Sequence, residues 1–371
     1  MSFLPPHYCL NLHAGLQLAL APNGEINVSP CPMPHETIPL GSHKAFDHPR
    51  LIELRTTNIQ NKELEGFCAK CDTRYNDSAL ICSNRSSTNE FYIKDKLLYN
   101  QSGPKQITFK LNYVCNLACV TCGPELSSKW RVEKKIKGGT LSTDKDYLRN
   151  TIRNINLENL ETVHIFGGEP FLTDTHEVIL EELTPFAKNI TVWYDTNGTV
   201  LPSQRVMDLW EPFHLIRLKF SIDGIGDSFN YLRWPGDWPS TQDKILTMVE
   251  TLPYNHMFSV RPAIGFLNFH IIKEIRDWQQ KYLKTNRMGD NTEFEYNPVF
   301  GLFKAQNITQ AMKDDLLALY SKDDPINIVM PKLVVGNNQI LNDIKQTLIA
   351  LDSIRKLDYT KSLPHLVKYL Q

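Results

Sequence analysis

This chain of 371 residues has no cysteine after Cys122, which is the last of its eight cysteines. Charge of one sign is not in excess either, because 40 Lys and Arg residues face 41 Asp and Glu residues. No apolar run approaches the roughly 20 residues of a transmembrane helix, and the amino terminus lacks the basic and apolar segments of a signal peptide. These absences argue against a membrane protein, a nucleic-acid partner and a disulfide-stapled secreted chain. We therefore expect a soluble cytoplasmic protein.

The cysteines that are present fall into short-spaced groups. One group has the spacing C-x3-C-x2-C and consists of Cys115, Cys119 and Cys122. The other five lie nearer the amino terminus and include one C-x2-C pair: Cys9, Cys31, Cys68, Cys71 and Cys82. Short spacings of this kind indicate metal ligands rather than disulfides.

The middle of the chain alternates between strand-like and helix-like segments. Strands are expected near 106–112, 162–166, 189–195, 216–222, 258–264 and 292–298, with helical segments such as 174–187 and 268–283 between them. Six such βα steps imply a parallel sheet with right-handed crossovers, two short of a closed eight-stranded barrel. We predict an α/β fold with a partial (βα)6 barrel over residues 104–305.

Two further units are expected to flank this core. Residues 1–103 are rich in turn formers, and two strand-like runs around Pro22-Asn23-Gly24 predict a β-hairpin in a small cysteine-rich domain. Gly103-Pro104 is a plausible linker to the core. Residues 306–371 read as a helical extension, with the strongest amphipathic segment at 337–357.

The three-cysteine loop comes directly after the first core strand, so it is expected at the sheet edge where ligands gather in parallel architectures. A cubane iron–sulfur cluster takes four thiolates when the protein supplies every ligand, so three leave one iron open for another molecule. A zinc knot or a chance spacing is the alternative. Zinc sites favour C-x2-C pairs and four ligands, and no histidine follows at a suitable spacing.

A second motif, Gly167-Gly168-Glu169-Pro170, follows the second predicted strand, where glycines let the backbone approach a ligand closely. Together, C-x3-C-x2-C and GGEP resemble the radical S-adenosylmethionine (SAM) superfamily. The resemblance implies that Cys115, Cys119 and Cys122 bind a [4Fe–4S] cluster whose open iron is chelated by SAM. It also implies that Gly167, Gly168 and Glu169 hold the methionyl amine, while Pro170 turns the chain outward.

Three later stretches, YDTNGT, SIDG and NYLRWPGDW, resemble the later strand ends of that family. The resemblance implies that Ser221 and Asp223 reach the ribose or carboxylate of SAM and that Ile264 packs on its adenine. Ser221 is about equally well explained as a simple strand end. The family often has an aromatic residue beside the adenine, where this chain has Thr121. His164 is isolated in the sequence, and a structural role is favoured for it.

The amino-terminal cysteines, with the hairpin between the first two, resemble a SPASM/twitch auxiliary-cluster domain, which more often follows the radical SAM core. The resemblance implies a second [4Fe–4S] cluster bound by Cys9, Cys31, Cys68 and Cys71, serving electron transfer or fold stability. Cys82 is then a core residue, a substitute ligand or a reactive thiol. A four-cysteine zinc site is the alternative.

The resemblance implies reductive cleavage of SAM to a 5′-deoxyadenosyl radical, which abstracts a hydrogen atom from the substrate. The enzyme would then be an oxidoreductase or would catalyse another radical-mediated transformation. Peptide or protein modification is favoured, and radical oxidation or rearrangement of a sugar, alcohol or nucleoside is the alternative. A non-catalytic iron–sulfur or zinc binding module is the alternative of another class. The expected partners are the substrate and an electron donor such as flavodoxin or ferredoxin, with no nucleic acid and no membrane.

Overall fold

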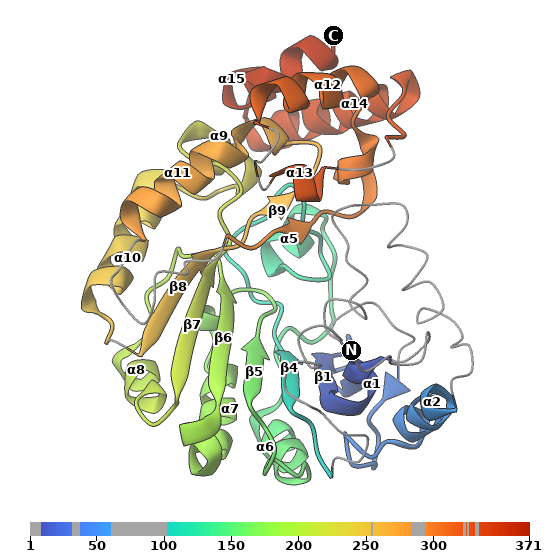
Figure 1. The fold of residues 1–371 in the computed structure, drawn as a ribbon, viewed down its shortest axis with the longest axis vertical. Coiled ribbons are helices and arrows are strands. Elements are labelled where there is room, and N and C mark those ends of the chain that lie inside the picture. The colour runs from blue at the N-terminus through green and yellow to red at the C-terminus, as the bar shows by residue number, and fades with distance from the viewer. Residues whose placement is uncertain are drawn as a thin grey trace.

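The computed structural model describes residues 9–31, 38–60, 102–253, 255–283, 294–321, 324, 326–330 and 334–371. Its largest element is an eight-stranded sheet with the order β3-β2-β1-β4-β5-β6-β7-β8 (Figure 1). These strands are β1 (Gly15–Leu20), β2 (Ile26–Ser29), β3 (Ile38–Pro39), β4 (Gln106–Lys110), β5 (Thr162–Ile165), β6 (Thr191–Thr196), β7 (Leu215–Phe220) and β8 (His256–Val260).

The strands from β4 to β8 are parallel neighbours in sequence order, which confirms the predicted α/β fold with a mostly parallel sheet. Of the sixth predicted strand, only residues 294–298 lie within the described part of the chain. Phe294 makes one parallel bridge to Val260, and β10 (Asn297–Pro298) pairs with β9 (Ala263–Ile264) in a separate two-stranded sheet. Closure into a (βα)6 barrel therefore stays a prediction.

The predicted hairpin is confirmed, because β1 and β2 are antiparallel and the turn at residues 21–25 joins them. However, β1 also pairs in parallel with β4, so the sheet continues across the predicted domain boundary between residues 103 and 104. The physical reason is burial: Leu16 and Leu18 of β1 lie opposite Ile107 and Phe109 of β4, and all four are at most 1% exposed. The hairpin therefore shares the core of the main sheet.

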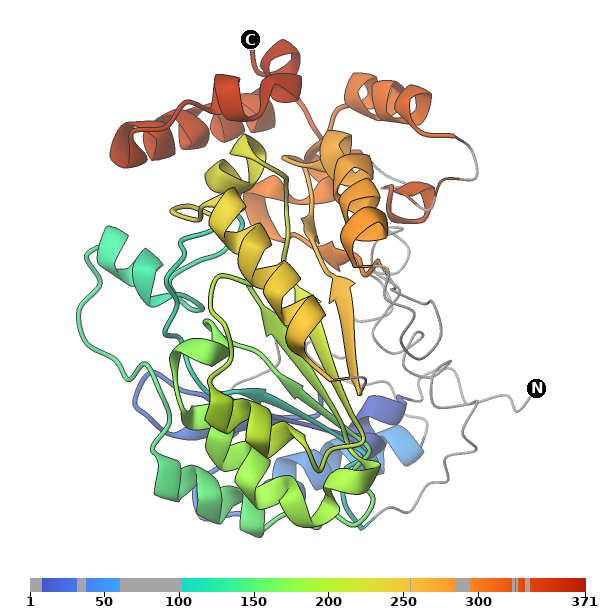
Figure 2. The same ribbon diagram turned by 90° about the vertical axis from the view of Figure 1, so that its left-hand side faces the viewer.

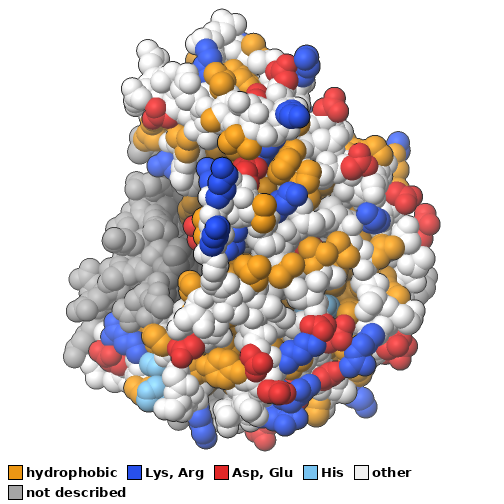
Figure 3. Space-filling model, turned by 180° about the vertical axis from the view of Figure 1, so that it is seen from behind, with side chains coloured by type: hydrophobic (Ala, Val, Ile, Leu, Met, Phe, Trp, Pro, Cys, Tyr) orange, Lys and Arg blue, Asp and Glu red, His pale blue; other side chains and the backbone are white. Residues whose placement is uncertain are grey.

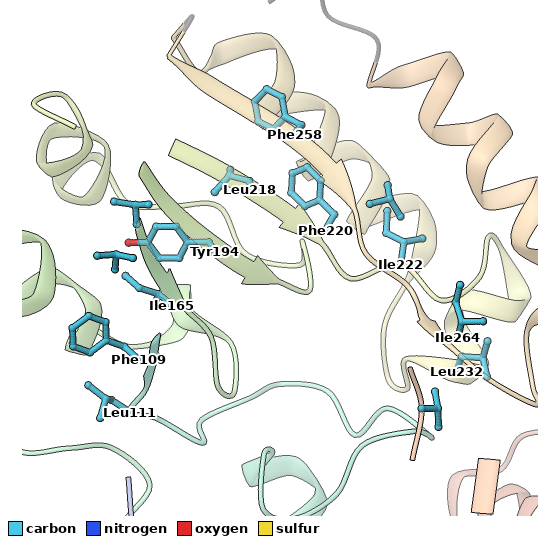
Figure 4. Packing of buried hydrophobic residues seen from close by; sticks show 14 of the residues in the cluster. Phe109, Leu111, Ile165, Tyr194, Leu218, Phe220, Ile222, Leu232, Phe258 and Ile264 are labelled. Carbon is cyan, nitrogen blue, oxygen red and sulfur yellow. The ribbon is translucent and has the colours of Figure 1, made fainter. Parts of the chain in front are cut away.

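Helices cover one face of this sheet (Figures 1 and 2). The helices after β4, β5, β6 and β7 include α6 (Lys145–Arg153), α7 (Thr175–Leu183), α8 (Gln204–Trp210) and α10 (Trp238–Thr251). Tyr194 of β6 contacts His176 of α7 and Trp210 of α8. Fully burying a side chain such as Leu or Phe contributes about 1.5–3 kcal/mol, and Figure 4 shows several such side chains on the strands and on the segments that follow them.

Alternation along the strands leaves the opposite face to other residue types. On β7, Ile216, Leu218 and Phe220 are fully buried on the helix-covered side, so Arg217 and Lys219 must point the other way. We call this opposite side the polar face of the sheet.

The carboxyl-terminal residues form helices over the end of the sheet where α5 (Ser128–Glu133) follows β4 (Figures 1 and 2). They are α12 (Gln310–Leu319), α13 (Ile326–Val329), α14 (Asn338–Arg355) and α15 (Tyr359–Ser362). The amphipathic segment predicted at 337–357 is α14, which begins where the side chain of Asn337 accepts a hydrogen bond from the Ile340 N–H at 3.0 Å.

The remaining described helices are α1 (Leu10–Ala14), α2 (Pro49–Ile59), α9 (Asp227–Leu232) and α11 (Ile272–Tyr282). Short 3-10 turns complete the fold: Pro170–Leu172, Thr184–Asn189, Phe269–Ile271, Gly301–Phe303, Ala305–Asn307 and Pro364–Tyr369. No helix in the described part of the chain combines the length and the apolar character that crossing a bilayer requires.

Ion pairs link neighbouring helices on their outer surface. Arg205 of α8 pairs with Glu177 and Glu181 of α7, and its side chain is 61% exposed. Figure 3 shows acidic and basic side chains side by side over the lower part of one face of the molecule. Exposed pairs of this kind contribute little to stability.

Candidate active site

The three-cysteine loop is held by backbone hydrogen bonds to a segment far along the chain. The Ala118 N–H donates to the Trp234 carbonyl at 2.6 Å, and the Val120 N–H donates to the Leu232 carbonyl at 2.8 Å. Trp130 of α5 donates its indole N–H to the Cys119 carbonyl at 2.8 Å. These bonds fix the loop backbone without using the cysteine side chains.

Two of the thiols face nitrogen donors, whereas the Cys122 thiol donates to the Gly123 carbonyl. The sulfur of Cys115 lies 3.5 Å from the Leu117 N–H and 3.9 Å from the amide nitrogen of Asn197. The sulfur of Cys119 lies 3.9 Å from a guanidinium nitrogen of Arg233. Burial raises the pKa of Cys115 to about 11 and also raises the pKa of Cys119 and Cys122. The thiols therefore keep their protons at neutral pH until a metal displaces them.

The donors around two of the thiols would suit an iron–sulfur cluster. A cubane holds its thiolates at separate corners rather than around one atom, and hydrogen bonds to its sulfurs tune it. Amide and guanidinium donors directed at Cys115 and Cys119 are suited to that task.

The GGEP motif is joined directly to the strand that leads into the cysteine loop. Gly168 donates its N–H to the Asn112 carbonyl at 2.9 Å, and Glu169 donates its N–H to the Val114 carbonyl at 2.7 Å. A Cβ atom on Gly168 would lie 2.1 Å from the Val114 oxygen, and one on Gly167 would lie 2.4 Å from the Asn112 oxygen. Glycine is therefore required at both positions by the contact between these two segments.

The carboxylate of Glu169 is fully buried and already holds protein donors. It accepts hydrogen bonds from the Thr196 hydroxyl at 2.8 Å, the Asn197 N–H at 2.7 Å and the Phe171 N–H at 3.3 Å. Burial raises the pKa of Glu169 to about 7, although these hydrogen bonds pull it back down. A carboxylate offers about four acceptor positions, so one remains for a further donor.

Asp223 and Arg233 form a buried pair beside the cysteine loop. Their charged atoms are 2.9 Å apart, and the other oxygen of Asp223 accepts the Ala263 N–H at 2.7 Å. Burial alone would lower the pKa of Arg233, but Asp223 and the nearby thiols raise it overall. Arg233 is therefore a permanent positive charge between Asp223 and Cys119.

The other predicted SAM contacts are placed as follows. Pro170 is buried and begins the turn after Glu169. Ser221 follows β7 and donates its N–H to the Thr196 carbonyl at 2.8 Å. Ile264 is fully buried within the hydrophobic core. The structure thus brings Gly167, Gly168 and Glu169 against the strand end before Cys115, while the roles of Ser221, Asp223 and Ile264 toward SAM stay predictions.

Asn197 and Arg233 were not assigned a role from the sequence, although both lie in the stretches that resemble the family. Asn197 touches both motifs, since its N–H donates to Glu169 and its amide lies near Cys115. Nothing local marks such a residue, because its partners are 28 and 82 positions away.

The amino-terminal cysteines are only partly described. Cys9 precedes α1 and Cys31 follows β2, so both flank the open end of the hairpin. The Cys9 N–H donates to the side chain of Asn58 at 3.0 Å. Cys68, Cys71 and Cys82 lie outside the described residues. The second cluster and its ligands therefore stay predictions.

A buried arginine from the carboxyl-terminal helices packs against the support of the cysteine loop. Arg355 of α14 lies 4.7 Å from the Trp130 ring centroid and 4.9 Å from the Trp234 ring centroid. Its guanidinium makes two hydrogen bonds to Glu133, at 2.9 and 3.1 Å. The Arg355 side chain is 0% exposed. The helical extension therefore packs against Trp130 and Trp234, two of the residues that hydrogen-bond to the backbone of the cysteine loop.

Comparison with known families agrees with this site. Residues 110–265 match the model of the radical SAM superfamily, a span that contains the cysteine loop and the GGEP motif. Over these residues the chain is therefore similar to a radical SAM superfamily domain. No curated protein matches the chain.

Solved structures give more distant likenesses. The chain is 15% identical to native anSMEcpe with bound AdoMet, with a TM-score of 0.39, over 68% of this chain and 62% of that chain. It is 15% identical to Streptococcus suis SuiB bound to the precursor peptide SuiA, with a TM-score of 0.42, over 71% of this chain and 55% of that chain. The alignments thus leave more than a third of each of these proteins unmatched.

Proposed function

We propose that this chain is a radical SAM enzyme that uses the Cys115–Cys122 loop and Glu169 as one site. The observation that carries the proposal is the bridging position of Asn197. Its N–H donates to the Glu169 carboxylate at 2.7 Å, and its side-chain amide lies 3.9 Å from the Cys115 sulfur. One residue thus links the motif that would hold the cluster to the motif that would hold SAM.

In this proposal each residue of the site has a separate role in binding the cluster or SAM. When bound, the cluster supplies the electron that cleaves SAM to methionine and a 5′-deoxyadenosyl radical. Cys115, Cys119 and Cys122 would hold it, and Arg233 would offset the negative charge of the thiolates. Glu169, oriented by Asn197, would accept a hydrogen bond from the ammonium group of SAM at its remaining acceptor position.

For the substrate we favour a peptide or protein, because the amino-terminal cysteines resemble auxiliary-cluster domains of peptide-modifying families. In this proposal Cys9, Cys31, Cys68 and Cys71 hold a second [4Fe–4S] cluster, and a flavodoxin or ferredoxin supplies electrons. Anaerobic reconstitution with SAM and dithionite tests the enzyme class. A radical SAM enzyme releases 5′-deoxyadenosine, whereas a non-catalytic binding module does not.

Glu169→Gln is expected to weaken SAM binding roughly ten- to a hundredfold, because a charge-assisted hydrogen bond contributes about 1.5–3 kcal/mol. The fold should survive. The new amide oxygen can still accept the Asn197 N–H, and the amide nitrogen can donate to the Thr196 hydroxyl, which accepts as well as donates. Only the longer hydrogen bond from the Phe171 N–H, at 3.3 Å, is lost. Equilibrium binding of SAM to the reconstituted protein measures the effect.

Binding to the unaltered protein should also depend on pH. Because burial raises the pKa of Glu169 from 4.5 to about 7, the carboxyl group holds its proton through that interval. SAM affinity should therefore fall as the pH drops below 7, approaching tenfold per pH unit, and Glu169→Gln should flatten this dependence. Glu177→Gln, in a surface ion pair, is the matched control. Affinity of Glu169→Gln within twofold of wild type would mean that the amine is held elsewhere.

A further inference from the structure

The segment after the cysteine loop carries five cations in nine residues. They lie on α5 and on the loop that follows it: Lys129, Arg131, Lys134, Lys135 and Lys137. The carboxylate in the same stretch, Glu133, is bonded to the buried Arg355 and is only 7% exposed. The whole chain, by contrast, has a formal net charge of -1. Positive charge is therefore concentrated here, and we call residues 129–137 the basic surface.

These cations are not neutralised by ion pairs within the described part of the chain. Three of the lysines are exposed, and none of the five side chains pairs with a described carboxylate. The contacts that they do make are with uncharged groups. Arg131 donates to the Gly138 carbonyl, and the ammonium groups of Lys129 and Lys134 each lie 5.5 Å from the centroid of a tryptophan ring. The basic surface therefore offers its charge to solvent or to a partner.

The helix α5 is followed by a lysine at a position where glycine is usual. Lys135 has a φ of 55°, in the left-handed region. Its N–H donates to the Val132 carbonyl at 3.0 Å, and the Ile136 N–H donates to the Arg131 carbonyl at 2.9 Å. This pair of hydrogen bonds is a common helix ending that favours glycine, because a Cβ atom is strained in the left-handed conformation. A lysine here costs stability, so folding alone does not account for its charge.

Two apolar side chains are exposed among the cations. Val132 is 74% exposed and Ile136 is 43% exposed. In Figure 2, the cyan helix α5 and the loop after it lie at the outer edge of the molecule, where another protein can reach them. Protein interfaces combine an apolar centre with a polar rim, whereas interfaces with nucleic acid are more polar. The composition of the basic surface therefore fits the acidic face of another protein.

Trp130 lies between the basic surface and the cysteine loop. Its indole N–H donates to the Cys119 carbonyl at 2.8 Å, and the Lys134 ammonium lies 5.5 Å from the centroid of its ring. The Lys129 ammonium lies 5.5 Å from the ring of Trp234, whose backbone also holds the cysteine loop. Because electron transfer slows steeply with distance, an electron donor on this surface is well placed to reach a cluster held by Cys119.

We propose that the basic surface docks the acidic protein that donates electrons to the cluster. This inference rests on the proposed function, because it assigns a binding place to the electron donor of that same site. One electron passes from the reduced flavin or iron–sulfur centre of the donor to the cluster, so the donor is oxidised by one electron and the cluster is reduced by one. Complementary charge raises association rates roughly ten- to a thousandfold, and Val132 and Ile136 would lie in the apolar centre of the interface.

Association of flavodoxin, an acidic flavoprotein, with the reconstituted protein tests the docking surface by surface plasmon resonance. The probe is oxidised flavodoxin, so the measurement does not depend on catalysis. Lys137→Glu should lower the association rate roughly three- to tenfold at low salt, since this side chain is exposed. The difference should disappear at about 1 M salt, where the screening length is about 3 Å. Lys188→Glu, at an exposed lysine that precedes the amino end of β6, is the matched control.

Lys135→Gly separates docking from folding. Glycine adopts the left-handed conformation without strain, so the midpoint of thermal unfolding should stay the same or rise. The rate of flavodoxin association should nevertheless fall, because one cation is removed. If this lysine served the fold alone, the midpoint would fall and flavodoxin association would not change.

Reduction of the cluster separates electron delivery from binding. In stopped-flow measurements, reduction by flavodoxin hydroquinone should be slower in Lys137→Glu than in the wild type. Reduction by the methyl viologen radical cation should not be slower, because a positive surface repels a cationic reductant. A variant that slows both reductants equally would show damage to the cluster rather than loss of docking, and would contradict the inference.

Three further results would overturn the inference: equal association rates for Lys137→Glu and Lys188→Glu, rates that do not fall with salt, or tighter binding of a short RNA duplex than of flavodoxin. Release of 5′-deoxyadenosine with dithionite is measured on the same samples without the donor protein. A protein that releases it but fails the association tests disproves the docking surface alone. A protein that docks flavodoxin through Lys137 but releases none with dithionite disproves the proposed function.

Discussion

Replacing Cys115, Cys119 and Cys122 together with alanine is expected to remove about four irons per chain and to abolish SAM cleavage. The fold should survive, because the loop is held by the bonds from Ala118 and Val120 to the 232–234 segment and not by the thiols. Iron and sulfide content, 5′-deoxyadenosine release and thermal unfolding measure the three outcomes. Unchanged iron content in this variant would contradict the assignment of the cluster ligands.

The same variant tests the second predicted cluster. If Cys9, Cys31, Cys68 and Cys71 bind a cubane, the triple variant keeps its brown colour and about four irons, with an EPR signal that does not respond to SAM. A zinc site would leave a colourless protein with about one zinc per chain. Cys82→Ser in this background should keep the second cluster and Cys9→Ser should destabilise it; the reverse result would make Cys82 the ligand.

Arg355→Leu is expected to lower the free energy of unfolding by about 3–5 kcal/mol, because it leaves a buried carboxylate without its partner. That carboxylate is Glu133, only 7% exposed. The variant also removes the cation between Trp130 and Trp234, which support the cysteine loop. We therefore expect faster loss of iron to a chelator, well below the denaturation midpoint. Denaturant unfolding and the rate of iron release measure the two effects.

The double variant Arg355→Leu with Glu133→Leu separates these effects. It should recover much of the lost stability, since no charge is left unpaired, but iron release should stay fast because the contact with both tryptophans is still missing. Lys361→Leu, in an exposed pair with Asp358, is the surface control and should change neither quantity. Iron release at the wild-type rate in Arg355→Leu would show that the extension does not hold the loop.

Local pattern was enough to predict the parallel sheet and the position of the two motifs. The strands near 106–112, 162–166, 189–195 and 216–222 appear as β4, β5, β6 and β7, and α14 appears at the predicted amphipathic segment. Apolar periodicity depends on neighbours within a few residues, so one sequence reveals it. For the same reason the spacing of Cys115, Cys119 and Cys122 predicts a metal-binding loop, since all three cysteines lie close together in the sequence.

Only the tertiary structure decided the features that depend on contacts between residues far apart in the sequence. The hairpin was predicted, but its pairing with β4 was not, because strand pairing across about 90 residues leaves no local periodicity. Arg355 is another example: its partner Glu133 is 222 positions away, and an arginine on an amphipathic helix ordinarily reads as an exposed residue. The candidate site residues could thus be predicted from sequence, whereas Asn197, Arg233 and Arg355 make their contacts only when the folded chain brings distant segments together.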